Sequence, residues 1–419
     1  MSCNSSALNA SARAIRARFE RCFVAFVASI LSISIVVCGH ATLARAAVAE
    51  DIADRYRQEL QGIGHKQAPL KWAEAQYSLG NALLDIGQHG GSAAKLAEAI
   101  DAYRAALTQI PRSRFPLQWA AVSNNIGIAT FAIGERTNEV DTISEAVTIF
   151  RQALEERTLS RSPADWAATQ KNLGVALLGL GQRKSDLSIL TEAVSAFDEA
   201  LKGLDQERSP ADWATTQMHL GDALARSGEL GSDMDKLSRA TGAYQESMKE
   251  FSRDRRPRAW AIIQSRLGNV FQMIGTRESG VRSLSRAVDA YRNALEVFPR
   301  EEAPQQRAQT QIALGNALKR IGESQKDPIR LDEAIRVYRE ALQVLKRQDS
   351  PGLWASTQNN LGSALAILGR KEADATKLRE SVSAFQAALD EWTPEHAFHE
   401  NEIVRRNLDR ALLALGKPK

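Results

Sequence analysis

Cysteine is almost absent from this sequence, and the few copies lie near its start. The chain has 419 residues and three cysteines, Cys3, Cys22 and Cys38. The stretch after position 38 contains no thiol, which excludes internal disulfides and thiolate catalysis there. Packing of side chains must therefore hold that stretch together.

Aromatic residues are scarce as well, at 6% of a chain that is 44% hydrophobic. Most of the apolar content is thus aliphatic, and Ala and Leu dominate it. This balance is typical of helices packed through small side chains and disfavours a β-rich domain. A chain of this length is also too long for one ordinary compact core.

An excess of charge is missing from the body of the chain, residues 47–419. Residues 1–46 hold five Arg and one Glu, and removing these from 54 basic and 50 acidic residues leaves 49 of each. A neutral body does not indicate nucleic-acid binding.

Residues 1–46 have the order of an export signal. A polar, Arg-rich start precedes an apolar run from Cys22 to Cys38, and Ala44-Arg45-Ala46 fits an A-x-A cleavage site. We therefore predict a signal peptide and export, to the periplasm in a bacterium. The run is close to the shortest that spans a bilayer, so an uncleaved anchor in the inner membrane is the alternative.

Tryptophan recurs in the body at a fixed spacing of 47 residues, which defines a register position. This position is occupied by Trp72, Trp119, Trp166, Trp213, Trp260, Arg307 and Trp354, and then by Asn401. At the first seven, a proline precedes by three residues and glycines follow by eight and by fifteen. Several landmarks that keep one spacing without insertion identify a repeat array.

Each repeat is predicted to be a helical hairpin. Ser162 is expected to cap a first helix in which Pro163 takes the first position. Gly181, fifteen after Trp166, is expected to end that helix in the left-handed conformation. Gly174 lies inside it, and we expect its missing side chain to let the partner helix approach closely, which offsets a cost of about 1 kcal/mol. The tryptophans are expected to pack on the preceding second helix.

The predicted architecture is all-α: an α-solenoid of antiparallel hairpins with about sixteen helices. A half unit at 50–61 precedes seven hairpins over 69–397, and a capping helix at 398–416 follows. That last helix gains Arg405, Arg406 and Arg410, as a polar end of a solenoid requires.

The repeat resembles the tetratricopeptide repeat (TPR) through Leu-Gly-x-Ala-Leu followed by Ala-x-x-x-Tyr/Phe-x-x-Ala. The matching residues are Leu79, Gly80 and Leu83 in the first helix and Ala99, Tyr103 and Ala106 in the second. The usual unit has about 34 residues, so the chain is similar to a longer bacterial variant with Trp-Ala-x-x-Gln-x-x-Leu-Gly repeats. HEAT and armadillo repeats have a comparable period, but these two spacings favour TPR.

The resemblance covers residues 50–416. It implies a right-handed superhelix whose first helices line a concave groove, and it implies partner binding rather than catalysis. The family's groove positions lie five, nine and twelve residues after the register position. The candidate peptide-binding residues they give are Asn81, Asp222, Asn269, Asn316 and Lys319, to which we add Arg320 beside Lys319.

Groups that carry catalysis are not predicted. His396 and His399 are close in sequence, but no third ligand accompanies them, and a capping segment explains them better than a metal site. The glycine-rich stretch 87–92 lacks the Lys-Ser/Thr of a phosphate loop and is expected to be a flexible loop. We predict no cofactor, no metal and no enzyme.

The predicted function is a non-catalytic scaffold that binds a peptide or protein partner in the groove. The first alternative is a membrane-anchored assembly factor that keeps its leader. The second is a hydrolase or sugar-binding protein that uses the groove, which would need convergent carboxylates or histidines on the inner face.

Overall fold

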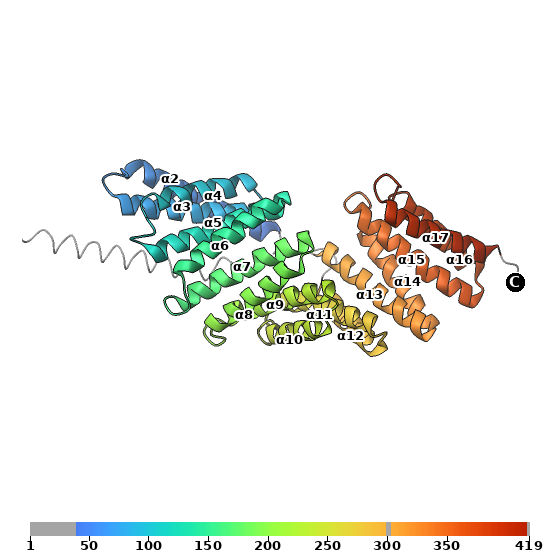
Figure 1. The fold of residues 1–419 in the computed structure, drawn as a ribbon. Helices are drawn as coiled ribbons and strands as arrows, with labels where there is room; N and C mark the ends of the chain where they lie inside the picture. Colours follow the sequence, from blue (N-terminus) through green and yellow to red (C-terminus); the bar gives the residue numbers. More distant parts are fainter. Residues whose placement is uncertain (1–38, 299–302, 417–419) are drawn as a thin grey trace, which may run out of the picture. The chain divides into compact units, whose positions relative to one another are not determined.

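The computed structural model of the protein describes residues 39–298 and 303–416, so the predicted leader and the three cysteines lie largely outside the described residues. Within the described ranges the fold is all-α, with sixteen helices arranged as TPR-like hairpins (Figure 1). None of these helices is long and apolar enough to span a bilayer.

The first helices of the hairpins begin 47 residues apart, as predicted. They are α3 (Pro69–Gly90), α5 (Pro116–Thr137), α7 (Pro163–Lys184), α9 (Pro210–Leu230), α11 (Pro257–Arg277), α13 (Pro304–Gln325), α15 (Pro351–Glu372) and α17 (Phe398–Leu415). The second helices are α2 (Gly39–Gly62), α4 (Ala93–Leu107), α6 (Val140–Glu156), α8 (Leu187–Gly203), α10 (Met234–Glu250), α12 (Val281–Val297), α14 (Pro328–Val344) and α16 (Ala375–Leu389).

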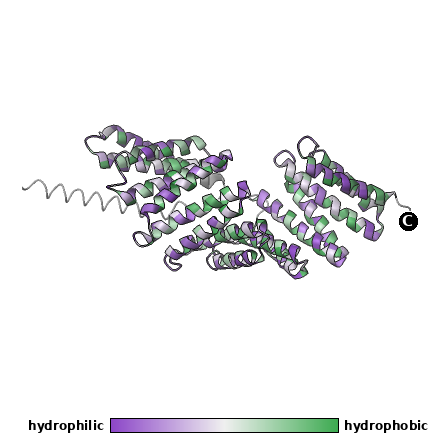
Figure 2. Cartoon of the chain, viewed as in Figure 1, coloured by the Kyte–Doolittle hydropathy of each residue, from purple (hydrophilic) through white to green (hydrophobic). Residues whose placement is uncertain are grey.

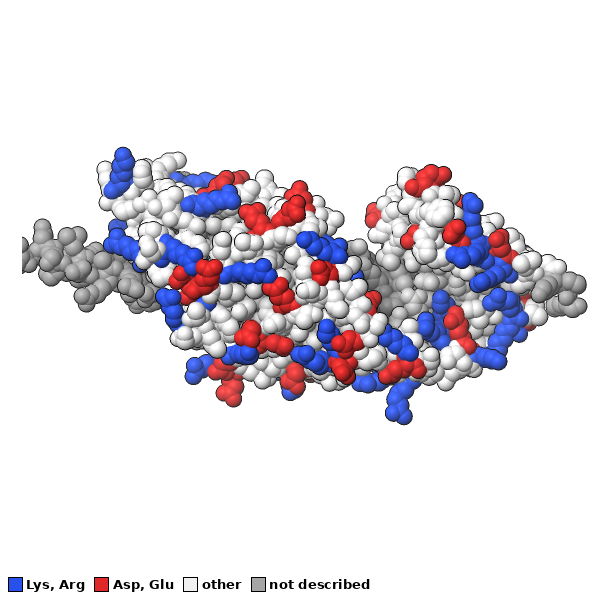
Figure 3. Space-filling view, in the orientation of Figure 1, with Lys and Arg blue, Asp and Glu red and all other residues white. Residues whose placement is uncertain are grey.

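The helices form two compact units. Unit 1 contains α2 to α10 and unit 2 contains α11 to α17. In each unit a helix packs mainly on its neighbours along the chain, so that hairpin stacks on hairpin. Hydrophilic and hydrophobic stretches are mixed along the helices in Figure 2, as amphipathic packing requires. Basic and acidic side chains are interspersed on the face seen in Figure 3, in line with the neutral body.

The glycine eight residues after the register position is a seat for an aromatic ring. A Cβ added to Gly80 would lie 2.5 Å from Cε1 of Tyr103 in the second helix of the same hairpin. The same contact recurs for Gly127 with Phe150, Gly174 with Phe197, Gly221 with Tyr244, Gly268 with Tyr291, Gly315 with Tyr338 and Gly362 with Phe385. The predicted close approach of the partner helix is therefore confirmed.

The glycine fifteen residues after the register position has a different role from the predicted one. Gly181 lies inside α7, which continues to Lys184, and the left-handed residue is Ser185 with φ 49°. A Cβ on Gly181 would meet Cγ of Leu190 at 2.9 Å, so this glycine is a second seat, now for an aliphatic side chain. Equally, α3 runs through Gly87 to Gly90, and the predicted flexible loop is reduced to its last residues.

The starts of the first helices follow the prediction for proline but not for serine. Pro163 occupies the first turn, yet the hydroxyl of Ser162 makes no capping bond and is buried without a partner among the described residues. Backbone groups close the turn instead, with Trp166 N donating to Ser162 O at 2.8 Å. Side-chain caps occur on second helices, where Asp186 accepts from the amides of Ser188 and Ile189.

The tryptophans pack within the hairpins and support arginines. The ring of Trp166 lies against Gly203 of α8, the second helix of its own hairpin. Arg112 stacks over Trp119 with its Cζ 4.8 Å from the ring centroid and pairs with Glu156 of the same hairpin at 2.7 Å. The tryptophan register is thus mainly structural.

Where the register position holds Arg307, the side chain takes another role. Its Nη1 donates to the carbonyls of Leu295 and Phe298 at 3.0 and 2.8 Å, close to the end of α12. These are carbonyls that a helix end leaves without an intrahelical partner. The loss of tryptophan is therefore compensated by a capping interaction.

Candidate functional site

The candidate site is the face on which neighbouring first helices meet. In unit 1, α3 contacts α5, α5 contacts α7 and α7 contacts α9; in unit 2, α11 contacts α13, α13 contacts α15 and α15 contacts α17. Side chains five and six residues after the register position bridge these helices, as when Asn407 Nδ2 donates to Asn359 Oδ1 at 3.2 Å. We call this surface the first-helix face of each unit.

The position nine residues after the register is coupled to the second helix. In four hairpins a tyrosine hydroxyl donates to a side-chain oxygen there: Tyr103 to Asn81 (2.8 Å), Tyr244 to Asp222 (2.7 Å), Tyr291 to Asn269 (2.7 Å) and Tyr338 to Asn316 (2.6 Å). In the other three hairpins the tyrosine is a phenylalanine, and the position is Ile128, Val175 or Ser363. The amide or carboxylate therefore accompanies the hydroxyl.

The carboxylate of Asp222 fixes the direction of these bonds. A carboxylate only accepts, so the hydroxyl of Tyr244 must donate to it. The same geometry at Asn269 and Asn316 assigns their Oδ1 to the tyrosine and leaves their NH2 groups as the donors. This pairing was missed from the sequence, although the matched alternation of Tyr with Asn or Asp was visible in it.

In unit 1 the amides of the first-helix face bond mainly to one another. Asn125 Nδ2 donates to Asn81 Oδ1 at 3.0 Å and to the Tyr77 hydroxyl at 3.2 Å, and Asn172 Nδ2 donates to Asn124 Oδ1 at 3.0 Å. Burial raises the pKa of Tyr77 to about 12, and its bond with Asn81 opposes the shift. Asn81 is 6% exposed, and its Oδ1 accepts from Tyr103 and Asn125, so this side chain is already engaged inside unit 1.

Unit 1 also contains a buried guanidinium that the sequence analysis did not single out. Arg157, just after α6, is 1% exposed, and its Nη1 donates to Thr169 Oγ1 at 2.9 Å. Its Nη2 lies 3.7 Å from a carboxylate oxygen of Asp165, and its Nε is buried without a partner among the described residues. Burial lowers the pKa of Arg157, and the Asp165 charge opposes this.

In unit 2 the predicted residues Asn269, Asn316, Lys319 and Arg320 lie on two adjoining first helices, and we refer to these four residues together as the cluster. Asn269 is exposed on α11, and Asn316 is half-buried on α13. Lys319 and Arg320 follow Asn316 by three and four residues, which places all three on one side of α13. Gln272 occupies the matching place on α11, where its Oε1 accepts from the Tyr291 hydroxyl at 3.2 Å.

The charges of this cluster are uneven. Arg320 is exposed, whereas Lys319 is partly buried, and this burial lowers the pKa of Lys319 against the attraction of Glu323 one turn further on. An ammonium group that has lost part of its hydration gains most from a negatively charged or carbonyl ligand. The cluster of Asn269, Asn316, Lys319 and Arg320 is therefore a set of hydrogen-bond donors.

The described helices contain no evident metal-binding site. Among residues 47–298 and 303–416, no three His, Cys, Asp or Glu side chains lie together in a way that suits a metal ion. The side chains on the first-helix faces can donate and accept hydrogen bonds.

Comparison with known proteins gives likenesses in fold only. No protein-family model matches the sequence, and no curated protein matches it. The C-terminal part of a TPR repeat-containing protein from Cytophaga hutchinsonii is similar in structure, with a TM-score of 0.47 and 12% identity over 81% of this chain and 99% of that one.

Two further structures are similar at lower scores. BtubC from P. vanneervenii has a TM-score of 0.39 and 17% identity, over 61% of this chain and 93% of its own. The Rap conjugation gene regulator of plasmid pLS20, solved with the Phr* peptide, has a TM-score of 0.39 and 13% identity, over 88% and 94%. Scores below 0.5 support no statement about ligands. The described helices themselves establish an all-α, TPR-like array of hairpins.

Proposed function

We propose that this protein is a non-catalytic scaffold that binds an extended peptide segment of a partner on the first-helix face of unit 2. The observation that carries the proposal is the pair Asn269 and Asn316. They hold equivalent places on adjoining helices, and each has its oxygen engaged by a tyrosine hydroxyl. Two NH2 donors are thereby preoriented at a repeating spacing.

A peptide backbone offers the matching chemistry. Carbonyl groups recur along an extended chain, and spaced amide donors can bond to them without reading the side chains. Preorientation lowers the entropy that binding must overcome. Lys319 and Arg320 add positive charge beside Asn316, so we infer that the favoured segment carries an acidic side chain or a terminal carboxylate.

The test replaces the donors and keeps the fold. In the double variant Asn269→Asp/Asn316→Asp, each carboxylate still accepts from its tyrosine, as Asp222 does from Tyr244. Two donors are lost, at about 1 kcal/mol each, and two negative charges face the ligand. We expect binding of acidic peptides, selected from a random peptide library on the wild-type protein, to weaken by at least about 30-fold.

A matched control separates binding from folding. Tyr291→Phe/Tyr338→Phe removes the hydroxyls and leaves the amides, so we expect a modest loss of affinity and a small loss of stability. Asn293→Asp makes the same chemical change on the second helix α12 and should leave the affinity unchanged. If the Asn→Asp variant binds the selected peptides as well as the wild type does, the proposed site is wrong.

We also propose that the protein is exported and that its leader is removed after Ala46. The support is the order of residues in the leader, which lies largely outside the described residues. The intact mass of protein recovered from cells should correspond to a chain that begins at Ala47. A mass that includes residues 1–46 would favour the membrane-anchored alternative.

A further inference from the structure

The outer face of α17 has the features of a helix-docking seat. In the seven hairpins, the residues eight and fifteen after the register position are the glycines that receive a ring and an aliphatic side chain of the second helix. The corresponding residues are Asp409 on α17 and Gly416 directly after it, and Leu412 lies between them. Among the described residues no second helix follows α17.

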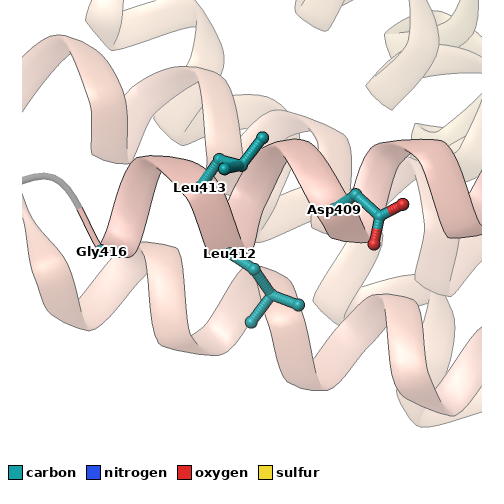
Figure 4. Close-up of a pocket in the computed structure, with 4 residues that line it drawn as sticks. All are labelled: Asp409, Leu412, Leu413 and Gly416. Atoms are coloured by element: carbon teal, nitrogen blue, oxygen red, sulfur yellow. The ribbon is translucent and has the colours of Figure 1, made fainter.

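This seat is open and partly apolar. Asp409, Leu412, Leu413 and Gly416 line a pocket at the C-terminal end of α17 (Figure 4). Leu412 and Leu413 are 46% and 68% exposed, and Phe398 at the start of the helix is 65% exposed. The helix was predicted to present a polar end, but its outward side thus combines large apolar side chains with charged ones. Solvent-exposed apolar groups in such an arrangement mark a contact surface.

The seat specifies the helix that fits it. In the hairpin of α3 and α4, Leu96 meets Gly87 and Tyr103 meets Gly80, so the docked antiparallel helix presents its two contacts seven residues apart. A helix on α17 must therefore present a bulky apolar residue at Gly416 and, seven residues later, a group that suits the Asp409 carboxylate. That group must be a cation or a donor, because Asp409 replaces the glycine that admits a ring.

The second copy of α17 meets this requirement. Phe398 and Arg405 are seven residues apart on the same outward side, and both are exposed. In an antiparallel pair of α17 helices, Phe398 of each copy faces Gly416 of the other when Arg405 of each faces Asp409 of the other. One register thus satisfies both apolar contacts and both ion pairs, and it has the two-fold symmetry of a homodimer.

We propose that the protein forms a homodimer through α17, with Phe398 on Gly416 and Arg405 paired with Asp409 across the interface. The helix α2, the other lone half unit, is a poorer occupant because Ala49, which is buried, holds the position of Leu96 and offers no bulky apolar side chain for Gly416. A surface of one helix per copy is small, so the dimer is expected to be weak, with a Kd on the order of 10 μM.

The test is a charge reversal followed by its rescue, measured by sedimentation equilibrium on the protein as purified from cells. In the Asp409→Arg variant, Arg405 of each copy faces an arginine of the other copy in place of Asp409. Both ion pairs become repulsive contacts, and we expect the Kd of dimerisation to rise at least about tenfold. The double variant Arg405→Asp/Asp409→Arg restores both ion pairs with reversed sign and should return the Kd to within about threefold of the wild type.

Two further variants complete the test. Asp289→Arg makes the same change of charge at an exposed place on α12 and should leave the dimer intact. Gly416→Leu fills the place of the incoming Phe398 and should weaken the dimer about tenfold without lowering the melting temperature. A wild-type protein that stays monomeric at about 100 μM, a dimer that tolerates Asp409→Arg, or a double variant that stays monomeric would each overturn the proposal. None of these outcomes bears on peptide binding at Asn269 and Asn316.

Discussion

The substitution Gly221→Ala is expected to destabilise the hairpin of α9 and α10 by about 2 kcal/mol, although alanine is the better helix former. The new Cβ would lie 2.6 Å from Cε1 of Tyr244, and the hydroxyl of that ring is held by Asp222. The ring is buried and cannot move aside without breaking this bond and disturbing its neighbours. Overpacking a filled core typically costs 1–3 kcal/mol, which exceeds the gain in helix propensity.

A matched control lies in the partner helix. Gly242 is inside α10, and a Cβ added there meets nothing within 4 Å. Gly242→Ala should therefore stabilise the same hairpin by about 0.5–1 kcal/mol. Native-state hydrogen exchange of the α9 and α10 amides measures both effects locally, which matters because repeats can open separately. Equal effects of the two substitutions would contradict the role given to Gly221.

The hairpin array was predictable because its determinants are local and repeated. Proline at the first turn indicates a helix start, apolar residues at helical spacing indicate a helix, and a fixed period indicates a repeat. Each of these patterns has only one structural interpretation. The glycine fifteen residues after tryptophan has two structural interpretations: it can end a helix in the left-handed conformation, or it can allow a neighbouring helix to approach closely. Sequence reasoning chose the first for Gly181, and the contact with Leu190 in space decides for the second.

The hydrogen-bond partners of the candidate site residues were not predictable from the sequence. The family resemblance selected Asn81, Asn269 and Asn316 by their place nine residues after the register position. It did not show that a tyrosine 22 residues later occupies each oxygen, because that contact joins two helices. The consequence differs between units: Asn81 is buried among other amides, whereas Asn269 is exposed. The burial of such a side chain depends on the neighbouring repeats, so the sequence of a single repeat does not predict it.

Arg157 shows the same limit for a charged group. Its equivalents in the other repeats are apolar, namely Ile110, Leu204, Phe251, Phe298, Leu345 and Trp392. Those residues are expected at a packed helix end, so the arginine stands out once the repeats are aligned. Whether such a side chain turns to solvent or inward depends on Thr169 and Asp165 of the following helix, which only the folded chain brings to it.

Replacing Arg157 is expected to give effects of opposite sign according to the size of the new side chain. Burial lowers the pKa of this guanidinium, which means that the folded state disfavours its charge; the group stays charged at pH 7, so that cost reduces stability there. Arg157→Met keeps the apolar stem and removes the charge and the unpartnered Nε. Asp165 is 40% exposed and keeps its hydration, and the Thr169 hydroxyl still donates to the Asp165 carbonyl.

We therefore expect Arg157→Met to leave the packing of α6 on α7 equally stable or to stabilise it by about 1–2 kcal/mol, as replacement of a buried ion pair by apolar groups often does. Arg157→Ala instead leaves a cavity and should cost about 3 kcal/mol. Urea unfolding of both variants, with hydrogen exchange of α6 and α7, measures the difference. A methionine variant that loses as much stability as the alanine variant would show that the guanidinium stabilises unit 1, and the uniformly apolar side chains at this position in the other repeats would then need another cause.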